Sequence, residues 1–156
     1  NGGNKVATGE NSITPASFKT KLNKKYFASF SEVQKAQKGK GQQCLIDARP
    51  AAFFTGDKKH AKARIPGRLA NARNLQEGNL IDDSFKMKPS SAIKSQFGGL
   101  DGVEQYKGYI SYCNTGHWAA TVWFGLSEIA QIPNVKMYDG GMTHWTSNPK
   151  RKVDLG

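Results

Sequence analysis

Residues 108–130, GYISYCNTGHWAATVWFGLSEIA, contain the clearest structural pattern of the chain. It begins with a short apolar run, Gly108–Tyr112, which is typical of a buried strand. A glycine-bearing turn, Asn114–Gly116, follows. Apolar residues then recur at spacings of three and four, which predicts a helix with one buried face from His117 to about Ile129. The pattern therefore predicts a strand, a tight loop and a helix in succession, with Cys113 where the strand meets the loop.

This position favours chemistry at Cys113. A strand that runs into a tight loop and then a helix directs successive backbone N–H groups at one point, where the helix dipole also favours negative charge. A thiolate at that point is stabilised and can act as a nucleophile. The alternative is an ordinary buried cysteine at a strand end, which is the commoner fate of a free thiol. The glycine three residues later and the helix that begins beside it favour the reactive interpretation.

Four segments, in the same order along the chain, resemble the rhodanese family of sulfurtransferases. Residues 112–120 (YCNTGHWAA) resemble the family's persulfide loop, a strand-end cysteine with a glycine three residues later and an alanine-rich helix beyond. Residues 44–49 (CLIDAR) are similar to its apolar strand ending in Asp-x-Arg. Residues 65–75 resemble its Ile-Pro-Gly turn and following strand, and residues 135–145 resemble its last strand and Tyr-Asp-Gly turn. Together the four cover roughly residues 12–148.

The third segment also departs from the family pattern. Arg68 and Leu69 stand where one alanine is usual, and Arg64 replaces the customary histidine. In the persulfide loop, His117 and Trp118 stand where the family often offers an arginine or lysine for the sulfonate of the donor. The chain therefore leaves the identity of the sulfur donor open.

The resemblance implies an α/β fold of three layers, α/β/α, with a central, mostly parallel sheet of about five strands. The pattern of the chain agrees, because short apolar strands separated by helices predict a parallel sheet covered on both faces. Ligands of such sheets bind beyond the carboxyl ends of the strands, where Arg49, Cys113 and Asp139 should meet. Strands are expected at Gln43–Ala48, Ala70–Leu75, Gly108–Tyr112 and Val135–Tyr138, and helices are expected to begin at Thr14, Ser31, Pro89 and His117.

The function implied by the resemblance is transfer of sulfane sulfur from a donor such as thiosulfate to cyanide or a thiol, through a persulfide on Cys113. The backbone N–H groups from Asn114 to Ala119 should bind the anionic donor and the persulfide, without a cofactor or metal. Trp118 is expected to form a pocket wall. His117 either binds an oxyanion when it is cationic or is simply exposed at the helix start. The expected substrate-binding residues are Asn114, Thr115, Gly116, His117, Trp118, Ala119 and Arg49.

Arg49 has two interpretations. In the resembled family this position lies near the pocket, where the arginine contacts the substrate or holds the loop. The alternative is a surface ion pair with Asp47 or Asp139. Asp47 itself is expected to organise the turn rather than to transfer protons.

Two other functions are compatible with parts of this pattern. Phosphatases and arsenate reductases of the same architecture clamp an oxyanion with an arginine six residues after the cysteine. Position 119 is alanine, which argues strongly against them. A non-catalytic or sulfur-carrier module, acting with a protein partner, would carry the same motifs. The chain could also be one half of a tandem enzyme, since residues 47–49 and 138–140 resemble the carboxy-terminal half of two-domain members.

Charge is distributed unevenly along the 156 residues. The formal net charge is +11, and residues 1–73 contain 15 of the 23 basic residues but only 4 of the 12 acidic ones. The lysines from Lys19 to Lys40 fit a solvated face. The basic residues from Lys58 to Arg73 should lie at the mouth of the active site, where they would attract a small anion or an acidic carrier protein. No helix-turn-helix, zinc spacing or aromatic-and-basic sheet motif indicates nucleic-acid binding.

The remaining features concern organisation and compartment. Residues 1–12 are polar and without periodicity, which predicts a flexible leader before a single domain at residues 13–156. The high pI and missing initiator Met suggest a periplasmic or secreted protein after leader removal, although a cytoplasmic or excised chain would look the same. No apolar run is long enough to span a bilayer. Cys44 should lie about 16 Å from the active edge, too far to pair with Cys113, and is expected to be a core residue.

Overall fold

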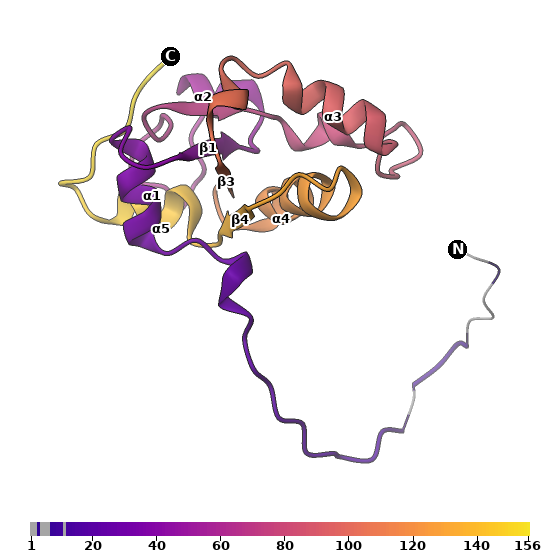
Figure 1. The fold of residues 1–156 in the computed structure, drawn as a ribbon. Helices are drawn as coiled ribbons and strands as arrows, with labels where there is room; N and C mark the ends of the chain where they lie inside the picture. Colours follow the sequence, from indigo (N-terminus) through magenta and orange to yellow (C-terminus); the bar gives the residue numbers. More distant parts are fainter. Residues whose placement is uncertain (1–2, 4–6, 11) are drawn as a thin grey trace.

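The four strands of the computed structural model, which describes residues 3, 7–10 and 12–156, form one parallel sheet (Figure 1). They are β1 (Gln43–Asp47), β2 (Ala72–Asn74), β3 (Gly108–Tyr112) and β4 (Val135–Tyr138), in the order β2-β1-β3-β4. The α/β prediction is therefore confirmed, with four strands in place of about five. At the β4 edge a single bridge from Phe27 to Met137 occupies the fifth position.

Helices cover both faces of the sheet because side chains alternate along each strand. Cys44 and Ile46 of β1 face one core, whereas Leu45 faces the other. The first core is closed by α3 (Ser90–Gly98) and α4 (His117–Phe124), and the second by α1 (Phe30–Gln37) and α5 (Gly141–Ser147). The shorter elements are η1 (Lys24–Tyr26), α2 (Ala51–Thr55), η2 (Glu77–Leu80), η3 (Val103–Gln105) and the π-helical turn η4 (Gly125–Ile129), which continues α4.

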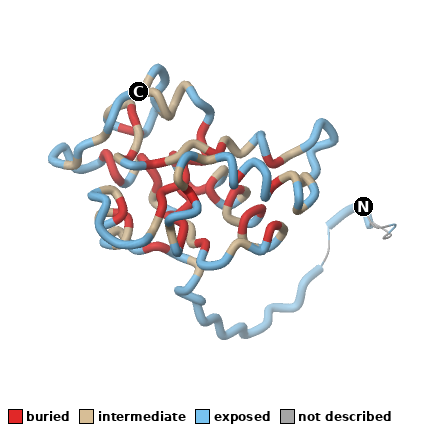
Figure 2. The backbone as a smooth tube through the Cα atoms, turned by 45° about the horizontal axis from the view of Figure 1, so that its top comes forward, coloured by how far each residue is buried: buried red, intermediate tan, exposed pale blue. Residues whose placement is uncertain are grey.

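The prediction of a helix that begins at Thr14 is wrong. Residues 12–23 contain no helix and are exposed throughout (Figure 2). Phe18 is 85% exposed and Leu22 is 65% exposed, so their shared face has nothing to pack against. A helix this short is marginal in water unless its apolar face is buried. Of the predicted leader, residues 1–2, 4–6 and 11 lie outside the described residues, and both its flexibility and the domain start at residue 13 stay predictions.

An ion pair joins α1 to the sheet. Ser29 and Glu32 form a capping box at the start of α1, and the Glu32 carboxylate also accepts a hydrogen bond from Lys136 Nζ at 2.6 Å. Burial opposes ionisation of Glu32, but the hydrogen bonds from Lys136 and Ser29 outweigh it and lower the pKa of Glu32 from 4.5 to about 2. The pair therefore ties α1 to the last strand, β4.

Among the helices of the described residues, none is both long and apolar enough to cross a membrane.

The ion pair between Glu32 and Lys136 is expected to make the free energy of unfolding depend on pH in the acidic range. Because the folded pKa of Glu32 lies below its ordinary value, its contribution is complete above pH 4.5 and is lost as the pH falls through about 2. The carboxylate is partly exposed, so screening limits the contribution to about 1 kcal/mol. Urea unfolding of the wild type and Glu32→Gln should show a stability difference at neutral pH that closes near pH 2. A difference independent of pH would contradict this account.

Candidate active site

Cys113 directly follows β3, and the loop after it turns back toward its own sulfur. The Gly116 N–H donates a hydrogen bond to Cys113 Sγ, with the nitrogen 3.1 Å from the sulfur. Gly116 has a left-handed φ of +96°, and a Cβ there would lie 2.6 Å from Asp139 Oδ1. A residue other than glycine would be strained in this conformation and would collide with Asp139. The glycine spacing noted in the sequence thus brings a backbone donor to the thiol.

The predicted binding residues other than Arg49 share one loop and one helical turn, but their side chains point in different directions. Thr115 and His117 are exposed, and Thr115 Oγ1 lies 3.2 Å from His117 Nδ1. The Trp118 ring packs edge-on against Phe53 of α2, with centroids 6.0 Å apart. Ala119 is buried. These positions can therefore direct backbone N–H groups toward the sulfur, while the side chains of Thr115 and His117 face solvent.

The loop is buried at its base. Cys113 is 1% exposed and Asn114 is 2% exposed. The side-chain nitrogen of Asn114, Nδ2, is buried and has no hydrogen-bond partner among the described residues. An unsatisfied buried donor is uncommon, and it is concentrated at functional sites. Asn114 therefore offers a free donor one residue from the thiol.

Arg49 lies behind this loop. Its Nε and Nη2 donate to the Asp47 carboxylate at 2.9 and 2.6 Å, and Nη2 also donates to the Gly67 carbonyl at 2.9 Å. Its Nη1 donates to Asn114 Oδ1 at 3.4 Å. Burial disfavours the charged guanidinium, but the hydrogen bonds and the charge of Asp47 outweigh it and raise the pKa of Arg49.

Arg49 and Asp47 are 2% and 0% exposed, so the pairing of Arg49 with Asp47 is present as the alternative had it, but it is buried and does not lie at the surface. The cause is the position of Asp47, the last residue of β1, between β2 and β3. Arg49 holds the Cys113 loop through Asn114. Its contact with a substrate stays a prediction.

The first turn of α5 supports the loop from the other side. The Met142 N–H donates to the Cys113 carbonyl at 2.8 Å, and Thr143 donates to the Asn114 carbonyl from both its N–H and its hydroxyl, at 3.2 and 3.0 Å. A Cβ on Gly141 would lie 2.5 Å from the Cys113 carbonyl oxygen. The sequence indicated the glycine turn but not Met142 or Thr143, whose spacing carries no signal of this contact.

The basic segment after α2 lies at the same edge of the sheet, because its Gly67 carbonyl contacts Arg49. Lys58, Lys62 and Arg64 are exposed there. Arg73, predicted to join them, instead donates from Nε to the Asp101 carbonyl at 2.6 Å, because its side chain leaves β2 toward the segment before β3. Arg68 packs over the Phe54 ring, with its guanidinium carbon 4.5 Å from the ring centre, so the predicted basic rim keeps only the exposed residues among 58–64.

Cys44 is remote from this edge. It pairs with Tyr109 in the sheet, near the start of β3, whereas Cys113 follows the end of that strand. Burial raises the pKa of the Cys44 thiol from 9.0 to about 11, and the charge of Arg73 offsets this in part. Both cysteines are free. The prediction of Cys44 as a core residue is confirmed.

Comparison with known proteins gives consistent matches. The model of the rhodanese-like domain family matches residues 29–148. A 3-mercaptopyruvate sulfurtransferase from Escherichia coli is 31% identical over 111 residues, which cover 70% of this chain and 38% of that protein. The chain therefore spans about two fifths of the length of this relative.

Two solved structures have a similar fold. The anaerobic ergothioneine biosynthesis enzyme from Chlorobium limicola matches with a TM-score of 0.73 at 18% identity, over 85% of this chain and 32% of that one. The Tum1 protein from Saccharomyces cerevisiae matches with a TM-score of 0.68 at 22% identity, over 85% of this chain and 48% of that one. At these identities the two structures support the fold alone.

Proposed function

The chain belongs to the rhodanese family, and on that premise we propose that it is a sulfurtransferase in which Cys113 carries the transferred sulfur as a persulfide. The observation that carries the proposal is the hydrogen bond from the Gly116 N–H to Cys113 Sγ at 3.1 Å, in a loop between a strand and a helix. A donor in this position stabilises negative charge on sulfur, which both the attacking thiolate and the persulfide require.

The proposed reaction has two displacement steps. The Cys113 thiolate attacks the outer sulfur of thiosulfate, a new S–S bond forms, the S–S bond of thiosulfate breaks, and sulfite leaves with the electron pair. An acceptor such as cyanide then attacks the terminal sulfur, and the Cys113 thiolate is the leaving group. Thiocyanate is released and the original thiolate is restored, so no external oxidant or reductant is consumed.

Backbone donors supply the electrostatic part of this mechanism. The first N–H groups of a helix have no intrahelical acceptor. At the start of α4, the first hydrogen bond of the helical pattern runs from the Ala120 N–H to the Gly116 carbonyl. The N–H groups of residues 117–119, in the first turn of α4, are therefore free of intrahelical partners and directly follow the loop that holds Cys113. Fixed dipoles of this kind need no reorganisation as charge moves from the thiolate to the outer sulfur.

Side chains around the loop divide into supporting and flanking groups. Arg49 positions the loop through Asn114, and the free Asn114 Nδ2 is a further donor for the anion. Thr115 and His117 are exposed beside the loop and can contact a donor that approaches from solvent. The exposed basic rim of Lys58, Lys62 and Arg64 attracts small anionic donors, of which thiosulfate and mercaptopyruvate are the candidates.

The same basic rim favours a second candidate function, a sulfur carrier that exchanges persulfide with an acidic protein partner. Such a partner would be attracted by the charges that attract a small anion. Persulfide formation that is slow with both small donors but fast with a protein persulfide would favour the carrier over the free-standing enzyme.

Intact-mass spectrometry tests the persulfide directly. The protein is incubated with excess thiosulfate, the reagent is removed, and the mass is recorded before and after cyanide. We expect a gain of about 32 Da, one sulfur atom, which cyanide removes and which the Cys113→Ser variant lacks. If thiosulfate, mercaptopyruvate and a low-molecular-weight persulfide all fail to add sulfur to Cys113, the proposal is wrong.

A further inference from the structure

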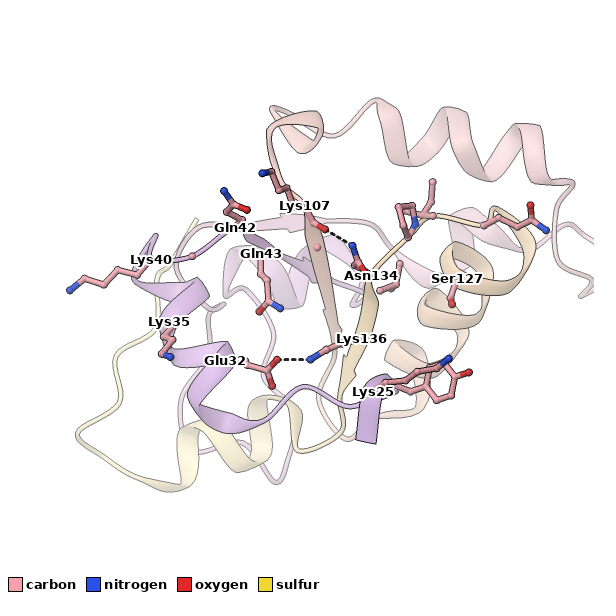
Figure 3. Close-up of a pocket in the computed structure, with 17 residues that line it drawn as sticks. Lys25, Glu32, Lys35, Lys40, Gln42, Gln43, Lys107, Ser127, Asn134 and Lys136 are labelled. Atoms are coloured by element: carbon pink, nitrogen blue, oxygen red, sulfur yellow. Dashed lines mark hydrogen bonds and ion pairs between the residues drawn. The ribbon is translucent and has the colours of Figure 1, made fainter. Parts of the chain in front are cut away.

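A cavity of about 880 Å³ lies at the amino-terminal edge of the sheet, opposite the edge that holds Cys113 (Figure 3). The starts of β1, β3 and β4 form its floor, and η1, α1 and the segment before β4 form its walls. Five lysines and one glutamate line it, namely Lys25, Lys35, Lys40, Lys107, Lys136 and Glu32. The cavity is thus strongly basic, and the mechanism proposed above makes no use of it.

Most of this positive charge is not compensated. Glu32 pairs with Lys136, with 2.6 Å between the charged atoms. In the described part of the chain, the other four lysines have no carboxylate within ion-pair distance. Lys25 Nζ lies 4.7 Å from the centre of the Tyr26 ring, which is part of the same wall. These four lysines are exposed at the rim of the cavity, so an anion that enters it would meet a surplus of positive charge there.

The rest of the lining is mixed. The side chain of Gln43 points into the cavity, between α1 and β4 (Figure 3). Ile132, Pro133 and Val135 supply an apolar wall. Pockets for small ligands usually combine an apolar surface with a few polar groups, and their volumes are roughly 300–1,000 Å³. This cavity has both properties.

We propose that the cavity binds a small molecule that carries a chain of phosphates. Lysine ammonium groups are compact point charges on flexible stems, so that several can close around phosphate oxygens. Single-stranded nucleic acid is less well matched, because such sites stack successive bases on several aromatic rings and Tyr26 is the one ring among the described lining residues. A concave site of this volume also fits a small ligand better than an extended acidic peptide.

The cavity is separate from the proposed sulfur-transfer site. Strand β3 begins at Gly108, which lines the cavity, and ends at Tyr112, immediately before Cys113. Five residues at about 3.3 Å each put roughly 16 Å between the two sites. A phosphate ligand in the cavity would therefore not compete with thiosulfate, and the inference does not depend on the proposed function.

Isothermal titration calorimetry with tripolyphosphate and with ATP tests the proposal. We expect both to bind the wild-type protein and Lys40→Gln/Lys107→Gln to bind them at least tenfold more weakly, since two charges of the lining are lost. The matched control is Lys86→Gln/Lys94→Gln, which removes two exposed lysines elsewhere and should change affinity less than about twofold. Equal affinity for tripolyphosphate and ATP would mean that the cavity recognises the phosphate chain alone. Tighter binding of ATP would mean that it also contacts the nucleoside.

Three results would overturn the inference. Equal weakening in both double variants would indicate general attraction to a basic protein. Tighter binding of an oligothymidylate or a polyglutamate peptide than of tripolyphosphate would indicate a macromolecular partner. Competition between tripolyphosphate and thiosulfate, seen as slower persulfide formation that excess thiosulfate relieves, would place the anion at Cys113 instead.

Discussion

Replacing Cys113 by serine is expected to lower the rate of sulfur transfer from thiosulfate to cyanide by about 10⁴-fold or more, as for the loss of other enzymatic nucleophiles. A hydroxyl cannot form the S–S bond that carries the transferred sulfur. The fold should survive, because a serine Oγ can also accept the hydrogen bond that the Gly116 N–H donates to Cys113 Sγ. The measurement is thiocyanate formation at saturating thiosulfate, beside circular dichroism.

The chain provides its own control in Cys44, which is 1% exposed, like Cys113. Cys44→Ser makes the same atomic change in the core near the opposite edge of the sheet. Burial of the hydroxyl should cost about 1–3 kcal/mol of stability while transfer stays within a few-fold of the wild type. Retention of a tenth or more of the activity in Cys113→Ser, or equal loss in the two variants, would exclude Cys113 as the sulfur carrier.

The part of the site that the sequence predicts is the part built from neighbouring residues. The strand, loop and helix around Cys113 lie within residues 108–130, and the glycine that brings an N–H to the thiol is three residues from it. Hydrophobic periodicity and turn residues encode such local geometry. The α/β arrangement follows in the same way, because strands and helices alternate along the chain.

Contacts between distant segments could not be predicted in this way. The hydrogen bond from Arg49 to Asn114 spans 65 positions, and the one from Thr143 to the Asn114 carbonyl spans 29. The first depends on the register of the parallel strands β1 and β3. The second depends on how α5 docks against the loop. The lysine cavity is a further case. Its lysines come from the basic first half of the chain and, as Lys107 and Lys136, from the neutral second half, and only the packed sheet brings them together.

The helix predicted at Thr14 failed for a related reason. The proline at the second position and the spacing of Phe18 and Leu22 satisfy the local rules for a helix start and an apolar face. Local rules do not supply a partner for that face, and both side chains remain exposed in the structure. Tertiary packing, which provides most of the stability of short helices, is absent here.

Replacing Arg49 by leucine is expected to destabilise the protein by about 3–5 kcal/mol, because the change leaves the buried Asp47 carboxylate without its partner. Asp47 is fully buried and receives bonds from Arg49 Nε, Nη2 and backbone N–H. Urea unfolding followed by circular dichroism gives the free energy. Arg73→Leu is the matched control, since Arg73 pairs at 3.8 Å with Asp101, whose side chain is 99% exposed. That pair should contribute about 1 kcal/mol or less.

A double variant distinguishes the cost of leaving Asp47 without its partner from the net contribution of the Asp47–Arg49 ion pair to stability. Asp47→Asn/Arg49→Leu removes both charges, so it should recover part of the stability that Arg49→Leu loses. It does not restore the bonds from Arg49 to the Gly67 carbonyl and to Asn114, which join two loops. We therefore expect the double variant to be more stable than Arg49→Leu, while both variants form the persulfide more slowly than the wild type. Recovery of stability and rate together would mean that Arg49 only neutralises Asp47 and has no part in positioning the Cys113 loop.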